Sequence, residues 1–139
     1  MTTTNLPIYV ASRASVPERG VMWRKFRAGG FRITSSWIDE DGEGQSDDLA
    51  DLWQRISDEV ARAYGVVLYA ESNDFPLKGA LIEVGIAIGL NKPIIVCLPN
   101  VELEPRSCRP IGSWINHPLV SRNDSVHAAM RAIANGEVW

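Results

Sequence analysis

The sequence contains few of the residues that build metal centres, disulfide frameworks and catalytic triads. There are two cysteines and two histidines in 139 residues. Cys97 and Cys108 have neither metal-ligand spacing nor a CxxC pattern, and the apolar run around Cys97 predicts a buried free thiol. His117 and His127 are not paired with a serine or cysteine in the order of a triad. We therefore expect no metal ion and no cofactor, and histidines that are structural or lie at the surface.

A strong charge of one sign and long apolar runs are also missing. The net charge is -3, from 14 basic and 17 acidic residues, which gives no overall attraction to nucleic acid or to anionic membranes. No run approaches the roughly 20 apolar residues that span a bilayer. Residues 1–5 lack the basic and apolar regions of a signal peptide. The sequence predicts a cytoplasmic protein with no nucleic acid polymer and no membrane as partner.

The composition that remains is typical of one globular domain. Hydrophobic residues make up 45% of the chain and charged residues 22%, the usual balance of such a protein. The length suits one ordinary domain better than two. We expect a single domain over residues 1–139, with its core at about 6–134.

Short apolar runs alternate along the chain with segments of helical periodicity. In the clearest helix, apolar residues recur at offsets of three and four from Leu49 to Tyr64, and Ser46 is placed to cap it. Its charged residues fall mostly off that stripe and predict a solvated face: Arg55, Asp58, Glu59 and Arg62. The expected strands are 6–11, 31–35, 66–70, 94–98 and 117–120, and the expected helices are about 15–29, 46–64, 79–90 and 125–134.

This alternation predicts an α/β fold, a doubly wound, flavodoxin-like parallel sheet of about five strands with helices on both faces. Ligands of such sheets bind beyond the carboxyl ends of the strands, where successive connections diverge. The rule selects the loops that follow Ala11, Ser35, Ala70 and Leu98 as the place of the site.

Glu83 is the charged residue that fits its surroundings least. It lies in the segment 79–87, near the start of a helix that is otherwise almost wholly apolar. Burying a carboxylate there is costly unless it is hydrogen-bonded or kept for a task. A glutamate at a helix start can also interact with the helix dipole. The pattern alone is compatible with a catalytic carboxylate and with this structural role.

Around Glu83 the chain resembles the nucleoside 2-deoxyribosyltransferases and the related nucleotide N-glycosidases. The resemblance rests on the strand 8–11, on Gly-Ala-Leu-Ile-Glu-Val-Gly at 79–85 and on Lys-Pro-Ile-Ile-Val at 92–96. It extends from about residue 8 to residue 98, most of the domain.

The resemblance implies a role for three residues. Glu83 occupies the place of the nucleophile that attacks the anomeric carbon, and Tyr9 the place of a tyrosine that orients it. Glu71 falls near a carboxylate that contacts the base and could protonate it. Members of the family complete their sites with a neighbouring subunit, which implies a homo-oligomer, a dimer or larger. Trp53 and Trp114 are our interface candidates.

Two positions depart from the family pattern. Leu77 stands where the transferases usually carry an aspartate, and Ala80 where they usually carry a threonine. These departures weigh against transfer more than against cleavage. Lys78 brings a positive charge to a helix start that already favours anions, which predicts a 5′-monophosphate substrate. The candidate substrate-binding residues are Arg13, Trp37, Lys78, Gly79 and Ala80.

The predicted function is cleavage or transfer at the N-glycosidic bond of a nucleoside or nucleoside 5′-monophosphate. Two alternatives remain open. One is a non-catalytic nucleotide-binding or sensing module on the same fold, and the other is a glycohydrolase of another nucleotide such as NAD. A cytokinin-type phosphoribohydrolase would carry a longer glycine-rich run, Pro-Gly-Gly before Gly-Thr, which residues 75–79 lack.

Overall fold

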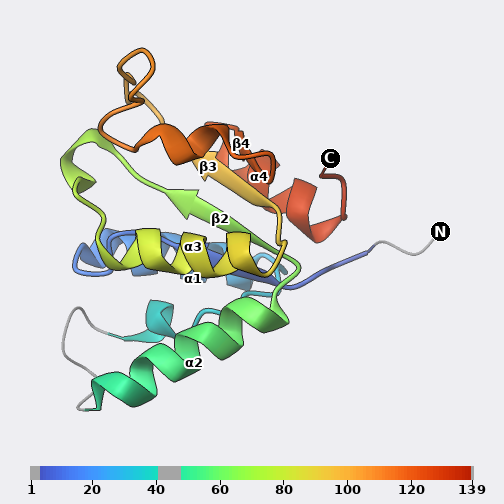
Figure 1. The fold of residues 1–139 in the computed structure, drawn as a ribbon. Helices are drawn as coiled ribbons and strands as arrows, with labels where there is room; N and C mark the ends of the chain where they lie inside the picture. The colour runs from blue at the N-terminus through green and yellow to red at the C-terminus, as the bar shows by residue number, and fades with distance from the viewer. Residues whose placement is uncertain (1–3, 41–47, 139) are drawn as a thin grey trace.

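The computed structural model describes residues 4–40 and 48–138. In the described residues, four parallel strands form one sheet in the order β1-β2-β3-β4 (Figure 1). The strands are β1 (Ile8–Ala11), β2 (Gly65–Tyr69), β3 (Ile94–Cys97) and β4 (Val120–Arg122). The α-helices are α1 (Pro17–Ala28), α2 (Leu49–Arg62), α3 (Gly79–Gly89) and α4 (Val126–Ala134), and short 3-10 helices are η1 (Ser36–Asp39), η2 (Ser72–Asp74) and η3 (Ser113–Asn116).

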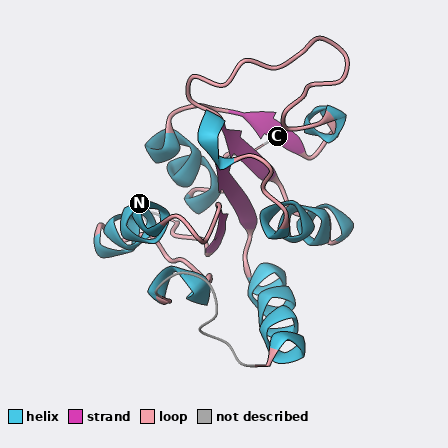
Figure 2. Ribbon diagram, turned by 90° about the vertical axis from the view of Figure 1, so that its left-hand side faces the viewer, coloured by secondary structure: helices cyan, strands magenta, loops and turns pink. Residues whose placement is uncertain are grey.

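Helices cover both faces of the sheet (Figure 2), as the run of apolar strands predicts. Successive side chains of a strand point to opposite faces. Val66 and Leu68 of β2 therefore join a core with α2 and α3. Val67, between them, packs with residues of α1 and α4 on the other face. The expected α/β architecture is confirmed.

The expected strand at 31–35 is wrong, and the sheet has four strands where we expected about five. The segment pairs with β1 only through an isolated bridge between Ile8 and Ile33. Beyond it the Ser35 hydroxyl replaces the backbone ladder, because its Oγ accepts from Val10 N at 2.8 Å and donates to Val10 O at 3.2 Å. The chain then turns into η1. A side chain that bonds the neighbouring backbone competes with a ladder in this way.

The helix ends follow local capping chemistry. The Asp48 side chain accepts a hydrogen bond from Asp51 N at 3.1 Å and caps α2. Ser46, the expected cap, lies outside the described residues. Ser125 caps α4 by accepting from Ala128 N at 3.2 Å. The edge strand expected at 117–120 begins at Val120, after a turn closed by the bond from Val120 N to His117 O.

Among the described residues, no helix has the length and apolar character needed to cross a bilayer. Cys97 is fully buried and free, as expected, and burial raises the pKa of its thiol to about 12. His127 packs against Phe26 and Phe31, and the Nδ1 of His117 accepts from Leu119 N. These histidines have the structural roles expected of them.

Candidate active site

A cavity of about 410 Å³ opens at the carboxyl end of β1, beside the start of α3. β1 lies between segment 31–35 and β2. The connection from β1 to segment 31–35 runs through α1 on one face of the sheet, and the connection from that segment to β2 runs through α2 on the other face. This divergence of connections is the place where ligands of such sheets bind. The walls come from four segments: the loop 12–15, Trp37 and Glu40, the α2 residues Leu49, Leu52, Trp53 and Ile56, and the segment 76–80 with Glu83.

Glu83 lies in the wall of this cavity and is almost fully buried, with 8% of its surface exposed. It belongs to the second turn of α3, on the side that carries Ala80, Val84 and Ala87 into the core. Burial raises the pKa of Glu83 to about 8, and the negative charge of Glu59 adds to the rise, while the hydrogen bond from Tyr9 lowers it. A carboxyl group in this state is a strong candidate for chemistry.

Tyr9 lies directly under Glu83 and is fully buried. Its hydroxyl donates a hydrogen bond to Glu83 Oε1. Tyr9 is the second residue of β1, and its side chain points to the face covered by α2 and α3. Burial and the adjacent Glu83 raise the pKa of the Tyr9 phenol, which therefore stays protonated and remains a donor. The structure thus brings together two of the three residues expected to be catalytic.

Glu59 is a buried member of the same neighbourhood, and the expectation that it faces solvent is wrong. Its side chain is 3% exposed, and its Oε1 accepts from Ser36 N at 3.0 Å. Arg55, one turn earlier, donates to Ser36 Oγ at 3.1 Å and to Glu40 Oε1 at 3.3 Å. Segment 34–40 leaves the sheet and needs polar partners, which this side of α2 supplies. Helical periodicity does not reveal such a partner, because it identifies only the apolar stripe.

Glu71, the third expected catalytic residue, is not brought to the cavity. It follows β2 and caps η2. Its carboxylate accepts a hydrogen bond from the Tyr69 hydroxyl and lies 3.4 Å from Arg19 Nη2. Burial and the bond to Glu71 raise the pKa of Tyr69 to about 12. Tyr69 packs on the face covered by α1 and α4, so Glu71 is held at the opposite face from Glu83.

The expected substrate-binding residues line the cavity. Arg13, Lys78, Gly79 and Ala80 all contribute to its wall. Lys78 precedes the first turn of α3 with φ 50° and ψ -104°, a conformation that costs a residue with a side chain on the order of 1–3 kcal/mol. Two N–H groups of the first turn, those of Ala80 and Leu81, donate to Leu77 O at 3.3 Å and to Lys78 O at 3.0 Å. The start of the helix carries the positive end of its dipole, which favours anions.

Two tryptophans line the cavity from different elements. Trp37 follows segment 31–35, and its Nε1 donates to Val10 O at 2.8 Å, which fixes the indole beside β1. Trp53 on α2 reaches over the start of α3, so that a Cβ added to Gly79 would lie 3.7 Å from its ring. Flat aromatic side chains suit the stacking of a planar base. Trp37 was expected here, whereas Trp53 was expected only at an interface.

Glu40 also lines the cavity and was not selected from the sequence. Its position in an acidic loop predicts exposure, and in the structure it forms an ion pair with Arg55 of α2 at 3.3 Å. Trp114 lies on η3, away from this cavity, with its Nε1 donating to Ile111 O at 2.8 Å. In the part of the chain that the structure describes, no group of three or more His, Cys, Asp or Glu residues could hold a metal ion.

No protein-family model and no curated protein matches the sequence. The fold is similar to solved structures. A 2-deoxyribosyltransferase from Leishmania mexicana matches with a TM-score of 0.65 and 18% identity, over 96% of this chain and 99% of that one. The CMP N-glycosidase BcmB from Clostridium botulinum matches with a TM-score of 0.51 and 14% identity, over 84% and 85%. The resemblance to nucleoside 2-deoxyribosyltransferase-like proteins is confirmed at the level of the fold.

Proposed function

We propose that this protein is an enzyme that breaks the N-glycosidic bond of a nucleoside or nucleoside 5′-monophosphate, with Glu83 as the nucleophile. The observation that carries the proposal is the buried pair of Glu83 and Tyr9 in the wall of a cavity of about 410 Å³. The fold shared with a deoxyribosyltransferase and a CMP N-glycosidase supports the same chemistry.

The chemistry requires Glu83 to act as a carboxylate. One of its oxygens attacks the anomeric carbon as the bond to the base nitrogen breaks, and the base leaves with the electron pair. Tyr9 orients the Glu83 carboxyl group through the hydrogen bond that its hydroxyl donates to Oε1. Attack by water then completes hydrolysis, and attack by a second base completes transfer.

The leaving base takes up a proton from solvent, and a carboxylate beside it can accept a hydrogen bond from the resulting N–H group. Glu40 lines the cavity beside Trp37 and is placed for this contact. Glu71 could reach the base only by leaving Tyr69 and Arg19. We therefore assign the base contact to Glu40 in preference to Glu71. A Glu40→Gln variant should lose more turnover than Glu71→Gln, and the opposite order would restore the original assignment.

The test of the function is the release of free base from a panel of nucleosides and their 5′-monophosphates, followed by chromatography. Glu83→Gln keeps the size and most hydrogen bonding of the side chain, so the variant should fold while turnover falls by at least about a thousandfold. Near-normal turnover in this variant would rule out the nucleophile. A bound and uncleaved nucleotide in the wild-type protein would select the non-catalytic module, and cleavage of NAD alone would select that glycohydrolase.

We further propose that the 5′-monophosphate is preferred over the free nucleoside. Arg13 and Lys78 bring two positive charges to the wall that also holds the start of α3. A charge-assisted contact contributes about 1.5–3 kcal/mol. Lys78→Ala should lower kcat/KM for the monophosphate about tenfold or more. Lys78→Gly is the matched control for backbone strain, because glycine adopts this φ without cost; both variants should lose the same phosphate preference.

We also propose that the protein forms a homo-oligomer and that an apolar surface of α2 and α3 is the contact between the subunits. Three side chains on these helices and one directly after α3 are large, apolar and exposed: Leu49 at 65%, Ile82 at 57%, Trp53 at 36% and, after α3, Leu90 at 47%. The surface adjoins the cavity, because Leu49 and Trp53 belong to both. A second copy seated there would cover these residues and close the cavity mouth.

A further inference from the structure

On the face of the sheet opposite Glu83, α1 is joined to the loop after β2 by a buried ion pair. The Asp74 side chain is 2% exposed and that of Arg19 is 12% exposed. Arg19 Nε and Nη2 donate to the Asp74 carboxylate at 2.9–3.2 Å, and Glu71 N donates to the same group at 2.8 Å. Burying two charges is costly unless such bonds satisfy them. The proposed chemistry uses neither residue.

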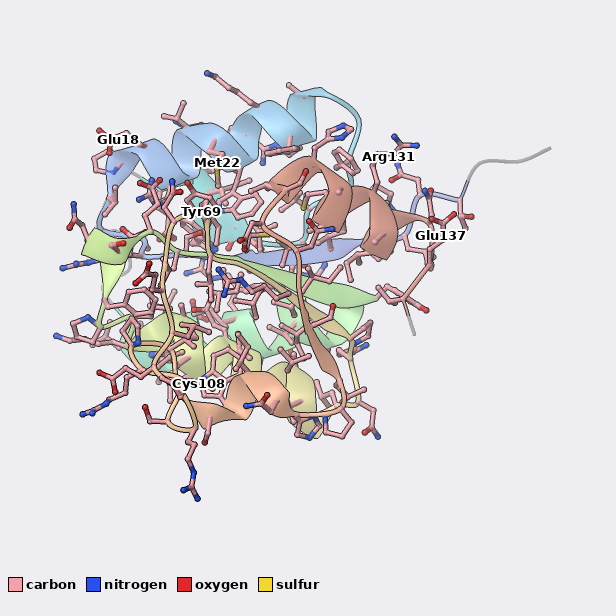
Figure 3. All side chains as sticks on the ribbon, turned by 90° about the horizontal axis from the view of Figure 1, so that it is seen from above. Glu18, Met22, Tyr69, Cys108, Arg131 and Glu137 are labelled. Carbon is pink, nitrogen blue, oxygen red and sulfur yellow. The ribbon has the colours of Figure 1, made fainter. Side chains whose placement is uncertain are left out.

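Arg19 is fixed from a second direction by the end of β2. Its guanidinium lies 5.1 Å from the centre of the Tyr69 ring, and its Nη2 lies 3.4 Å from Glu71 Oε2. Figure 3 shows the labelled Tyr69 on the side of the sheet that α1 covers. Aromatic stacking and a forked pair together leave the guanidinium little freedom. Asp74 is thereby held at one position relative to α1.

The turn η2, which contains Asp74, also binds Arg13, a residue of the cavity wall. Arg13 Nη1 donates to the carbonyl oxygens of Asn73 at 3.3 Å and Asp74 at 3.5 Å. Arg13 Nε donates to Ser15 Oγ at 3.3 Å. The chain continues from Asp74 directly into residues 76–80, which line the cavity. The side chain of Asp74 therefore binds Arg19 of α1, its backbone binds Arg13, and residues 76–80 after it form the part of the cavity wall that carries Lys78.

We propose that the Arg19–Asp74 pair positions Arg13 and the start of α3 for the phosphate monoester of the substrate. The proposal rests on the function proposed above and names the part of the fold that sets its phosphate preference. Asp74 does not line the cavity, so it acts through Arg13 and through residues 76–80. Arg19 and Asp74 are positioning residues in this scheme. Glu71 supports them, because it contacts both.

The alternative is that the pair only stabilises the fold. The two roles differ in what they do to selectivity. A purely structural loss lowers the amount of active enzyme and reduces kcat/KM for all substrates equally. Loss of positioning weakens the phosphate contact alone, so it changes the ratio of kcat/KM for a nucleoside 5′-monophosphate to that for the free nucleoside.

The test uses the double variant Arg19→Met/Asp74→Asn, which leaves no lone buried charge and keeps an acceptor for Glu71 N. We expect kcat/KM for the monophosphate to fall about tenfold through a higher KM, while the value for the nucleoside stays within about twofold. Arg19→Lys keeps the charge and loses the fork, and should give a smaller loss of the same kind. The matched control is Arg27→Met/Asp39→Asn, an exposed forked pair at 2.7–2.8 Å, which should change neither value.

An equal loss on both substrates, or no loss on either, overturns the proposal. Hydrogen exchange of residues 12–15 and 72–80 provides a measurement that needs no turnover, and exchange should be faster in the double variant than in the wild-type protein and unchanged in the Arg27→Met/Asp39→Asn control. If the wild-type protein cleaves neither substrate, the proposed function fails separately. Calorimetric titration with the monophosphate then decides the positioning role: about tenfold weaker binding by the double variant supports it, and equal or undetectable binding by both proteins overturns it.

Discussion

The carboxyl group of Glu83 has a pKa of about 8 because it is buried, and this value sets the pH at which it can act. A nucleophile must be ionised, so kcat/KM should rise with pH and level off above about pH 8. The hydrogen bond from Tyr9 lowers this pKa and the charge of Glu59 raises it. The two neighbours therefore predict opposite changes in the pH profile.

Tyr9→Phe should move the profile to higher pH and lower the plateau roughly tenfold to a hundredfold, because a charge-assisted hydrogen bond is lost. Glu59→Gln should move the profile to lower pH. The measurement is kcat/KM between pH 5 and pH 10 for the three proteins. A profile that moves in the same direction in both variants contradicts the assignment of Glu83 as the titrating group.

The same carboxyl group links folding stability to pH. Its folded pKa lies above the ordinary 4.5, so the folded state holds a proton that the unfolded state releases. This stabilisation is fully present below about pH 4.5 and is lost as pH rises to about 8. The change is on the order of a few kcal/mol, since each pKa unit corresponds to about 1.4 kcal/mol.

Glu83→Gln removes this dependence. The free energy of unfolding of the variant minus that of the wild-type protein should be more positive at pH 9 than at pH 5, so that the variant gains relative stability at high pH. Urea denaturation at the two values measures the difference, and Glu102→Gln, an exposed residue, is the control that should leave the wild-type dependence unchanged. A variant that follows the wild-type curve would place the raised pKa elsewhere.

At the scale of elements, segment 34–40 stabilises the site without being a strand. Ser35 is 2% exposed and satisfies both backbone groups of Val10. Ser35→Ala leaves the Val10 N–H buried without that acceptor, so the free energy of unfolding should fall by about 1–3 kcal/mol. Ser57→Ala on α2, which removes an exposed bond to Trp53 O, should cost less than about 0.5 kcal/mol. Denaturant unfolding of both variants tests the contrast.

The elements show how much of this fold could be predicted from sequence. We could predict β1, β2 and β3 from their apolar runs and α2 from its apolar stripe. Burial of a whole face decides where these elements form, and the apolar pattern reports that burial. Segment 31–35 alternates apolar and polar residues as a short strand does, yet Ser35 bonds β1 through its side chain. Period and composition do not distinguish a ladder from a hydroxyl that replaces it.

Residues of the candidate site could be predicted where they contradicted their surroundings, matched the family pattern or followed a strand at the expected edge of the sheet. Glu83 is conspicuous because it is a carboxylate in an apolar helix, and Tyr9 entered through the family resemblance. Glu59 and Glu40 look like ordinary charged residues of a helix face and an acidic loop. Their roles depend on contacts with Ser36 and Arg55 that form only when α2 packs on η1. No local pattern in the sequence predicts these contacts between α2 and η1.

At the scale of the whole molecule, the exposed side chains on α2 and α3 predict association. The protein should be a dimer or larger at micromolar concentration, and Ile82→Arg should yield a monomer by placing a charge in the contact. Light scattering measures the mass. Val21→Arg changes an equally apolar residue that is 41% exposed on α1, on the other face of the sheet, and should leave the mass unchanged. A wild-type monomer with full activity contradicts the proposal.

The two cysteines offer a chemical probe of this architecture. Cys97 is fully buried in β3 with a thiol pKa of about 12, whereas Cys108 is partly exposed in the loop before η3. Thiol reagents act on accessible thiolates, so the native chain should accept one label, at Cys108. A second label should be added only when the sheet opens. Mass spectrometry of pulse-labelled protein would then count unfolded molecules directly in every variant described above, without a substrate and without a fluorescent reporter.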